Sequence, residues 1–224
     1  MMSFLLPVVA LICYTLFVSP WHESNIVNLV QGKRCLVTGA SLGIGKEIAR
    51  EFVRMNASHI TIVARSDQKL KALREEMLSA IEDNGGLLAP AVHVIPADLS
   101  TRETSEKVIE SAVEKMGGLD YLVLNHITNS RYGLWEEQPN YDFVPEMFAV
   151  NTMSYIWLAN RALPALQASG KGQIVVVSSL AGWVGIPFTA VYASTKHALR
   201  GFFNALRTVR GASWLPLERR CRAY

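Results

Sequence analysis

Cysteine is scarce in this 224-residue sequence, and its scarcity narrows the possible classes of protein. The three cysteines, Cys13, Cys35 and Cys221, lie far apart along the chain. Cys13 falls in an apolar run and Cys35 in an apolar segment typical of a strand, so buried thiols explain these two better than a disulfide framework or a metal site. The histidines also lack the spacing of metal ligands. We therefore expect no metal site.

Long runs of one charge are missing as well. Charged residues make up 18% of the chain, the formal net charge is only +3, and the basic residues form no long stripe. A nucleic-acid partner is therefore not expected. Low-complexity segments and internal repeats are also lacking, while half of the residues are hydrophobic. That composition is typical of a globular chain with a sizeable core.

The first eighteen residues contain no charged side chain at all. As a helix this stretch would span roughly 27 Å, close to the ~30 Å hydrocarbon core of a bilayer. A cleaved signal peptide is the main alternative, although the stretch lacks a basic start and a small-residue cleavage site. A buried helix of a soluble protein is the third, and the lack of a polar face disfavours it. We expect residues 1–20 to be a membrane anchor or a signal segment.

Beyond residue 29, short apolar runs alternate with longer amphipathic stretches. The runs typical of buried strands are 34–38, 59–64, 91–97, 120–125 and 173–179. The stretches typical of helices are 45–55, 67–82, 101–116, about 141–167 and about 190–209. Strands that are apolar throughout and alternate with helices predict a parallel sheet covered on both faces. This is a Rossmann-type, doubly wound α/β fold, and we expect one dinucleotide-binding domain over residues 29–209.

A glycine-rich loop joins the first predicted strand to the helix after it. Its glycines are Gly39, Gly43 and Gly45. Small residues at a strand-to-helix junction let the backbone approach a pyrophosphate, and the helix start offers free N–H groups. A tight turn with close helix–strand packing is the alternative explanation. The position of the loop favours dinucleotide binding.

Arg65 indicates which dinucleotide is bound. It follows the second predicted strand, twenty residues after Gly45, where an NAD-type fold places a carboxylate on the ribose 2′-hydroxyl. An arginine matches a 2′-phosphate instead, because its charge and planar donors fit phosphate oxygens. Asp67 could serve as the ribose carboxylate, but a cap of the next helix together with Ser66 explains it more simply. We expect NADP(H) rather than NAD.

Four motifs in order resemble those of the short-chain dehydrogenase/reductase family. They are TGASLGIG (38–45), ADLS (97–100), VSS (177–179) and YASTK (192–196). Three further stretches are similar to the branch that contains 11-beta-hydroxysteroid dehydrogenase type 1 and its 1-like relatives. These are LNHITN (124–129), VVVSSLAG (175–182) and GFFNALR (201–207).

The resemblance implies catalytic and cofactor-binding residues. The catalytic set is Asn151, Ser179, Tyr192 and Lys196. The cofactor-binding set is Gly39, Ser41, Gly43, Ile44, Gly45, Arg65, Asp98, Asn125, Tyr192 and Lys196. Leu42 stands where this branch often has a lysine, so we expect the grip on a 2′-phosphate to depend more on Arg65.

Tyr192 and Lys196 lie four residues apart and would share one helix face. An unperturbed phenol has a pKa of about 10. An ammonium at an assumed ~5 Å and an effective dielectric of ~20 favours phenolate by about 3 kcal/mol, which is roughly two pKa units. Tyr192 could then exchange a proton with a substrate oxygen. Ser179 would hydrogen-bond that oxygen, and Asn151 would support a water-mediated proton path.

We therefore expect an NADP(H)-dependent oxidoreductase that interconverts a hydroxyl and a ketone on a steroid or a similar apolar substrate. A truncated, catalytically weak chain that binds cofactor or partner subunits is the alternative, and a retinoid or lipid dehydrogenase is a further one. The resemblance implies a homodimer. It also implies a single-pass protein of the endoplasmic reticulum membrane with a lumenal catalytic domain, or a secreted protein if residues 1–20 are cleaved.

The end of the sequence departs from the family pattern. Family members continue through two further strands after the helix that carries the tyrosine and lysine, whereas here the pattern is lost after about Arg207. We expect a fold truncated after that helix and an atypical tail at 210–224. The fifth strand would then be an exposed edge, with reduced stability and weak or absent turnover.

Overall fold

The computed structural model describes residues 29–83, 90–128, 132–138 and 140–211. The expected anchor at 1–20 and nearly all of the expected tail at 210–224 lie outside these ranges. Within them, no helix combines the length and the apolar character needed to cross a membrane.

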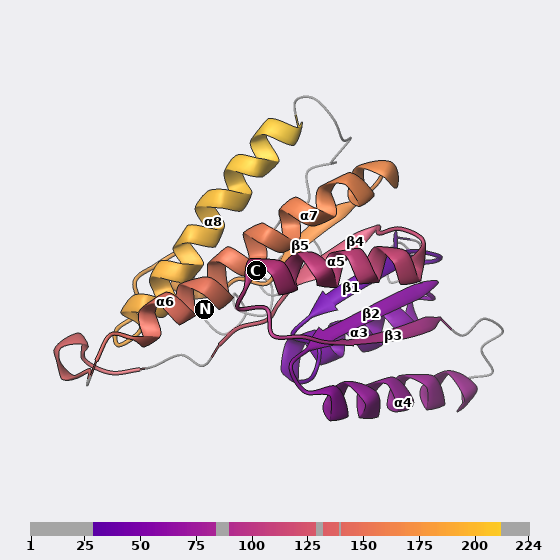
Figure 1. Cartoon of the computed structure of the whole chain (residues 1–224), viewed down its shortest axis with the longest axis horizontal. Helices are drawn as coiled ribbons and strands as arrows, with labels where there is room; N and C mark the ends of the chain where they lie inside the picture. Colours follow the sequence, from indigo (N-terminus) through magenta and orange to yellow (C-terminus); the bar gives the residue numbers. More distant parts are fainter. Residues whose placement is uncertain (1–28, 84–89, 129–131, 139, 212–224) are drawn as a thin grey trace, which may run out of the picture.

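The described strands form one parallel sheet (Figure 1). They are β1 (Arg34–Thr38), β2 (His59–Ala64), β3 (Ala91–Pro96), β4 (Tyr121–Leu124) and β5 (Gln173–Val176). Their order is β3-β2-β1-β4-β5, and every pairing is parallel. The predicted Rossmann-type α/β fold is therefore confirmed.

Helices cover both faces of this sheet, with α4 and α5 on opposite sides (Figure 1). The main helices are α3 (Gly43–Arg54), α4 (Asp67–Asp83), α5 (Arg102–Met116), α7 (Ser154–Ala168) and α8 (Ala190–Gly211). α3 and α4 pack together on β1, β2 and β3, whereas α5 packs against α7. The three inner strands, β1, β2 and β4, are apolar because both of their faces are buried.

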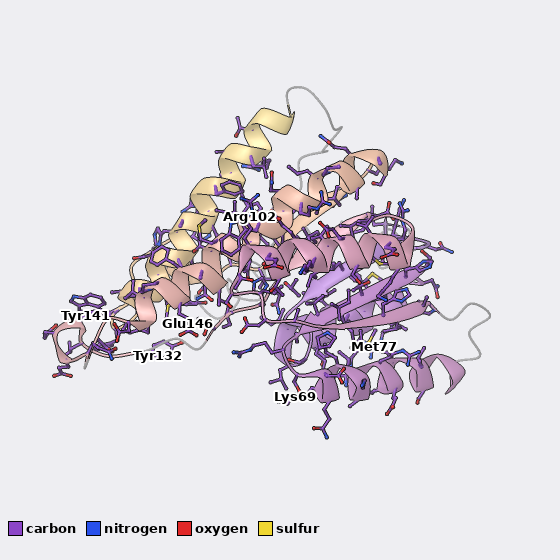
Figure 2. All side chains as sticks on the ribbon, in the orientation of Figure 1. Lys69, Met77, Arg102, Tyr132, Tyr141 and Glu146 are labelled. Carbon is purple, nitrogen blue, oxygen red and sulfur yellow. The ribbon has the colours of Figure 1, made fainter. Side chains whose placement is uncertain are left out.

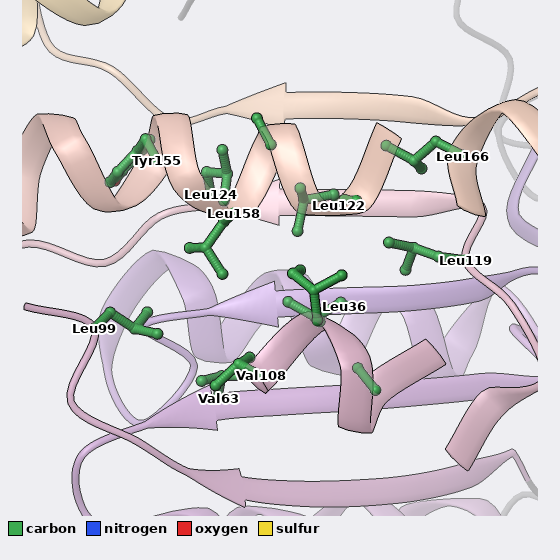
Figure 3. Packing of buried hydrophobic residues seen from close by; sticks show 14 of the residues in the cluster. Leu36, Val63, Leu99, Val108, Leu119, Leu122, Leu124, Tyr155, Leu158 and Leu166 are labelled. Atoms are coloured by element: carbon green, nitrogen blue, oxygen red, sulfur yellow. The ribbon is translucent and has the colours of Figure 1, made fainter. Parts of the chain in front are cut away.

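Alternate residues of one strand enter two separate cores. Leu36 lies in the core under α5 and α7, where it packs with Leu122 and Leu158 (Figure 3). Its neighbours Cys35 and Val37 point to the other core, under α3 and α4. All of these side chains are almost fully buried. Cys35 is thus the buried free thiol that its apolar surroundings predicted.

The predicted continuous helix over about 141–167 is wrong in one respect. The segment consists of α6 (Phe143–Phe148), a π-helical turn η3 (Ala149–Met153) and then α7. A π turn widens the helix by one residue and often occurs at functional sites. This turn carries Asn151, one of the predicted catalytic residues.

β5 lies at the edge of the sheet formed by the described residues. It pairs with β4 on one side, and its Val175 side chain is 39% exposed. β5 is thus an edge strand of the sheet that the described residues form, whereas the truncation of the fold stays a prediction.

Candidate active site

A cavity lies beside the carboxyl ends of the strands. β1 has β2 on one side and β4 on the other, so the chain reverses its direction of winding there, and α/β folds bind ligands at this position. The cavity measures about 660 Å³. Seven predicted cofactor residues line it: Gly39, Ser41, Gly43, Ile44, Arg65, Asp98 and Asn125.

The floor of the cavity requires glycines. Gly39 has φ +66°, and a methyl group there would lie 2.8 Å from the His126 Cα. A methyl group on Gly45 would press on the Gly39 carbonyl oxygen and lie 2.5 Å from Asn125 Nδ2. Gly45 does not itself line the cavity. It lies in the first turn of α3 and contacts the Gly39 backbone. The loop is thus a close-packed turn that exposes backbone to the cavity.

The start of α3 also faces this cavity. Gly43 is the first residue of the helix, and the preceding Leu42 provides no side-chain cap. The N–H groups of the first turn are therefore not taken by a capping side chain, and the positive end of the helix dipole lies beside them. These groups suit a pyrophosphate.

The far wall of the cavity is basic. Arg65, Ser66 and Lys69 line it, and both cations are exposed; Figure 2 marks Lys69 in the first turn of α4. Ser66 Oγ accepts the Lys69 N–H at 3.4 Å, and Asp67 pairs with Lys71 at 2.7 Å. Ser66 thus caps the start of α4, whereas Asp67, the first residue of the helix, is held by Lys71 and, among the described residues, forms no cap contact with the helix. Lys69 was not among the residues predicted from the sequence, although its position, four residues after Arg65, could have indicated it.

Tyr192 and Lys196 adopt the predicted arrangement on α8. Lys196 Nζ lies 5.7 Å from the centroid of the Tyr192 ring. The lysine is only 1% exposed, and burial lowers its pKa to about 8. Its ammonium also approaches the Val177 carbonyl oxygen at 3.5 Å. The lysine is therefore held beside the phenol while still mostly protonated at neutral pH.

Ser179 and Asn151 lie on elements that pack against α8. Ser179 precedes the short helix η4 (Leu180–Gly182), and Asn151 lies in η3; both elements contact α8. Ser179 Oγ accepts the Ala181 N–H at 3.2 Å, which leaves its own proton free to donate. Asn151 is fully buried and accepts the Thr128 N–H at 2.9 Å.

Asn151 Nδ2 is one of four buried side-chain atoms without a hydrogen-bond partner among the described residues. A buried unpaired donor is costly, so a water or ligand atom in this position would be favoured. The four predicted catalytic residues do not line the 660 Å³ cavity. Val150, next to Asn151, does line it. The catalytic roles remain predictions.

A buried histidine network is a second feature that was not predicted from the sequence. His126 Nδ1 lies 2.8 Å from Thr38 Oγ1, and its Nε2 lies 2.6 Å from Ser154 Oγ. Tyr155 donates its hydroxyl to the His126 carbonyl oxygen at 2.6 Å. Burial, aided by the charge of Lys196, lowers the pKa of His126 to about 3. This neutral imidazole joins β1, the segment after β4 and α7.

Large aromatic side chains lie outside the cavity. Trp135 and Tyr141 stack on each other at 4.6 Å, on a loop that projects away from the sheet (Figure 2). Trp183 stacks instead beneath the Arg200 guanidinium, 3.3 Å from its carbon. None of these three aromatic residues lines the cavity.

The sequence comparisons agree with this geometry. A profile of the short chain dehydrogenase family matches residues 33–210. The chain belongs to this family. It is 42% identical over 195 residues to the hydroxysteroid 11-beta-dehydrogenase 1-like protein A of Xenopus laevis, covering 87% of this chain and 63% of that protein. It is 40% identical over 187 residues to the human 1-like protein, covering 84% and 56%. The chain thus spans about three fifths of the length of these curated relatives.

Solved structures of the family share the fold. An alcohol dehydrogenase from the archaeon Thermococcus sibiricus, complexed with 5-hydroxy-NADP, superposes with a TM-score of 0.71 at 27% identity, covering 80% of this chain and 72% of that one. A metagenomic short-chain oxidoreductase in complex with NADP gives 0.72 at 27% identity, covering 81% and 78%. The chain therefore shares both the sequence pattern and the fold of the short chain dehydrogenase family.

Proposed function

We propose that this chain interconverts a hydroxyl and a ketone on a steroid or a similar apolar substrate, with NADP(H) as its cofactor. The observation that carries the proposal is the pair on α8. A lysine that is 1% exposed places its ammonium beside the ring of a tyrosine, on a helix that contacts both η3 and η4. Burial of an ammonium without a carboxylate partner is expensive and is typical of functional sites.

The residues of this chain fit NADP(H). Because Gly39 and Gly45 have no side chains, the backbone of the loop can approach a pyrophosphate closely, and α3 begins beside this loop. Arg65 and Lys69 supply two exposed cations for a 2′-phosphate, which supports NADP(H) over NAD. The NADP bound to the two solved relatives supports the same cofactor. When bound in reduced form, this cofactor supplies the hydride for the carbonyl carbon.

The side chains of α8 supply the proton. Tyr192 donates its phenolic proton to the forming alkoxide and takes it back in the oxidative direction. The Lys196 ammonium stabilises the phenolate that remains. Ser179 donates a hydrogen bond from its hydroxyl to the substrate oxygen. Asn151, through its unpaired Nδ2, holds a water that replaces the transferred proton.

The steroid class is proposed because two curated relatives, 42% and 40% identical to this chain, carry hydroxysteroid names. A retinoid or another apolar alcohol would use the same chemistry. We also propose that residues 1–20 anchor the chain in the endoplasmic reticulum membrane with a lumenal catalytic domain, or direct secretion if they are cleaved. A homodimer is proposed by resemblance to the family.

One observation favours a second function, in which the chain binds cofactor or partner subunits with little turnover. β5 is an edge strand of the sheet that the described residues form, and its Val175 side chain is 39% exposed, so this edge could face another subunit. A ketone panel separates these readings: steroid and retinoid carbonyls are incubated with NADPH and the full chain, and product is measured. Reduction of steroid ketones above the other carbonyls supports the main proposal. NADPH binding without product from any ketone supports the second.

A further inference from the structure

The ammonium of Lys196 has an unusual environment for a buried charge. The residue is 1% exposed, and its one hydrogen bond within the described residues is the long contact of 3.5 Å to the Val177 carbonyl oxygen. Among the described residues, no carboxylate forms an ion pair with it. A buried charge needs compensation from some other source.

Two aromatic rings from different helices provide that source. The Tyr155 centroid on α7 lies 5.4 Å from Lys196 Nζ, and the Tyr192 centroid on α8 lies 5.7 Å from it. Both distances fall within the ~6 Å range of cation–π attraction, which is strongest for desolvated cations. Tyr192 cannot be the whole answer, because its hydroxyl is the group proposed to change charge during the reaction.

Tyr155 is fixed in place. It is fully buried, and its hydroxyl donates to the His126 carbonyl oxygen at 2.6 Å. Its ring also packs against the His126 imidazole, with 4.6 Å between the ring centroids. Burial raises the pKa of the Tyr155 phenol above its usual range. The ring that faces the ammonium therefore stays neutral and oriented.

We propose that Tyr155 is a positioning residue for Lys196, and that its ring face holds the buried ammonium in its charged form beside Tyr192. The proposal rests on the proposed role of Lys196 in proton transfer and adds the group that keeps this lysine charged. If Tyr155 only filled space in the core, any apolar side chain of similar shape would serve equally well at this position. A cation–π partner must also be aromatic and electron-rich.

The groups that face Lys196 are few. His126, on the segment after β4, is neutral at working pH, because burial and the lysine charge lower its pKa to about 3. Tyr192 lies on the same helix, Tyr155 lies on α7, and Val177, after β5, contributes its carbonyl oxygen.

The test measures the pKa of Lys196 in the resting full chain, by NMR of ¹³Cε-labelled lysine with Lys196→Arg to assign the signal. Tyr155→Phe keeps the ring and loses only the hydroxyl bond, so it is the matched control, and we expect its Lys196 pKa to stay within about 0.3 units. Tyr155→Leu removes the ring face, and we expect the pKa to fall by about one unit. An unchanged pKa in Tyr155→Leu would overturn the proposal.

Because Tyr155 is buried, Tyr155→Leu could fail to fold, and a second series covers that case. Phenylalanine with one, two and three ring fluorines at position 155 keeps the shape and progressively weakens the negative ring face. We expect the Lys196 pKa to fall stepwise through the series, and a constant pKa would overturn the proposal. Neither experiment needs turnover, so a chain that reduces no ketone still tests Tyr155 independently of the proposed function.

Discussion

Gly45 is the residue at which side-chain size bears most directly on the cofactor. A methyl group there would press on the Gly39 carbonyl oxygen and lie 2.5 Å from Asn125 Nδ2. Gly45→Ala should therefore displace the loop, weaken NADPH binding by at least tenfold and cost about 1–3 kcal/mol of stability, as overpacking does. Gly201→Ala is the control, because a methyl group at Gly201 meets nothing within 4 Å. NADPH fluorescence titration measures the affinity of both variants. Equal affinities would contradict the claim that the loop lets the backbone approach the cofactor closely.

Lys69 tests the preference for a 2′-phosphate. It lines the cavity beside Arg65, whereas Lys71 lies outside the cavity and pairs with Asp67. Lys69→Gln should weaken NADPH binding roughly fivefold, about 1 kcal/mol for an exposed charge pair, and leave NADH binding unchanged. Lys71→Gln should leave both unchanged. Equal loss for the two dinucleotides would place Lys69 away from the 2′-phosphate.

Residues such as Arg65 and Tyr192 could be predicted because their neighbours in sequence carry the motif. His126 and Tyr155 could not, because their importance arises from contacts between segments far apart in the chain. The Thr38–His126 contact spans 88 positions, and His126 to Ser154 spans 28. An isolated histidine in a sequence gives no sign of such partners.

The histidine network makes a prediction at the scale of secondary-structure elements, since it ties β1 to α7 through the segment after β4. His126 is buried as the neutral form, with a pKa of about 3 against an ordinary histidine pKa of 6.5. The unfolded chain therefore binds more protons than the folded one between these two pH values. The network's contribution is complete above pH 6.5 and is lost as pH falls, by about 2 kcal/mol from pH 6.5 to pH 5.

Chemical denaturation at several pH values checks this dependence. His126→Gln should lose stability at pH 7 but show a flatter decline between pH 6.5 and 5 than the wild type. His93, whose pKa burial also lowers, contributes to the same range in both proteins and cancels in the comparison. His197→Gln, at an exposed position on α8, is the control and should keep the wild-type slope. An equal slope in His126→Gln would contradict the buried neutral histidine.

Helix and strand positions could be predicted because apolar runs and amphipathic stretches follow different periods. The π turn at Ala149–Met153 could not, because local sequence does not specify a shift of one residue in the hydrogen-bond register. Tertiary contacts hold it instead, among them the Thr152 hydroxyl donating to the Thr195 carbonyl oxygen at 3.2 Å. That bond joins the turn carrying Asn151 to the helix carrying Lys196.

For the whole molecule, the parallel sheet and its two cores follow from the sequence pattern, because strands that are apolar on both faces must be covered twice. The placement of the proton-transfer pair relative to the cavity depends on how α8, η3 and η4 pack, which no single segment encodes. The substrate class could not be predicted from the sequence either. In the structure, no described aromatic residue of the projecting loop lines the cavity.

The central claim is that the Tyr192 phenol, with the Lys196 ammonium beside it, protonates the substrate oxygen next to bound NADP(H). Single-turnover reduction of a steroid ketone, with the full chain in excess and saturated with NADPH, measures this step even where steady-state turnover is weak. Tyr192→Phe should bind NADPH as the wild type does and form product at least 100-fold more slowly. Equal rates of product formation in Tyr192→Phe and the wild type would contradict the account.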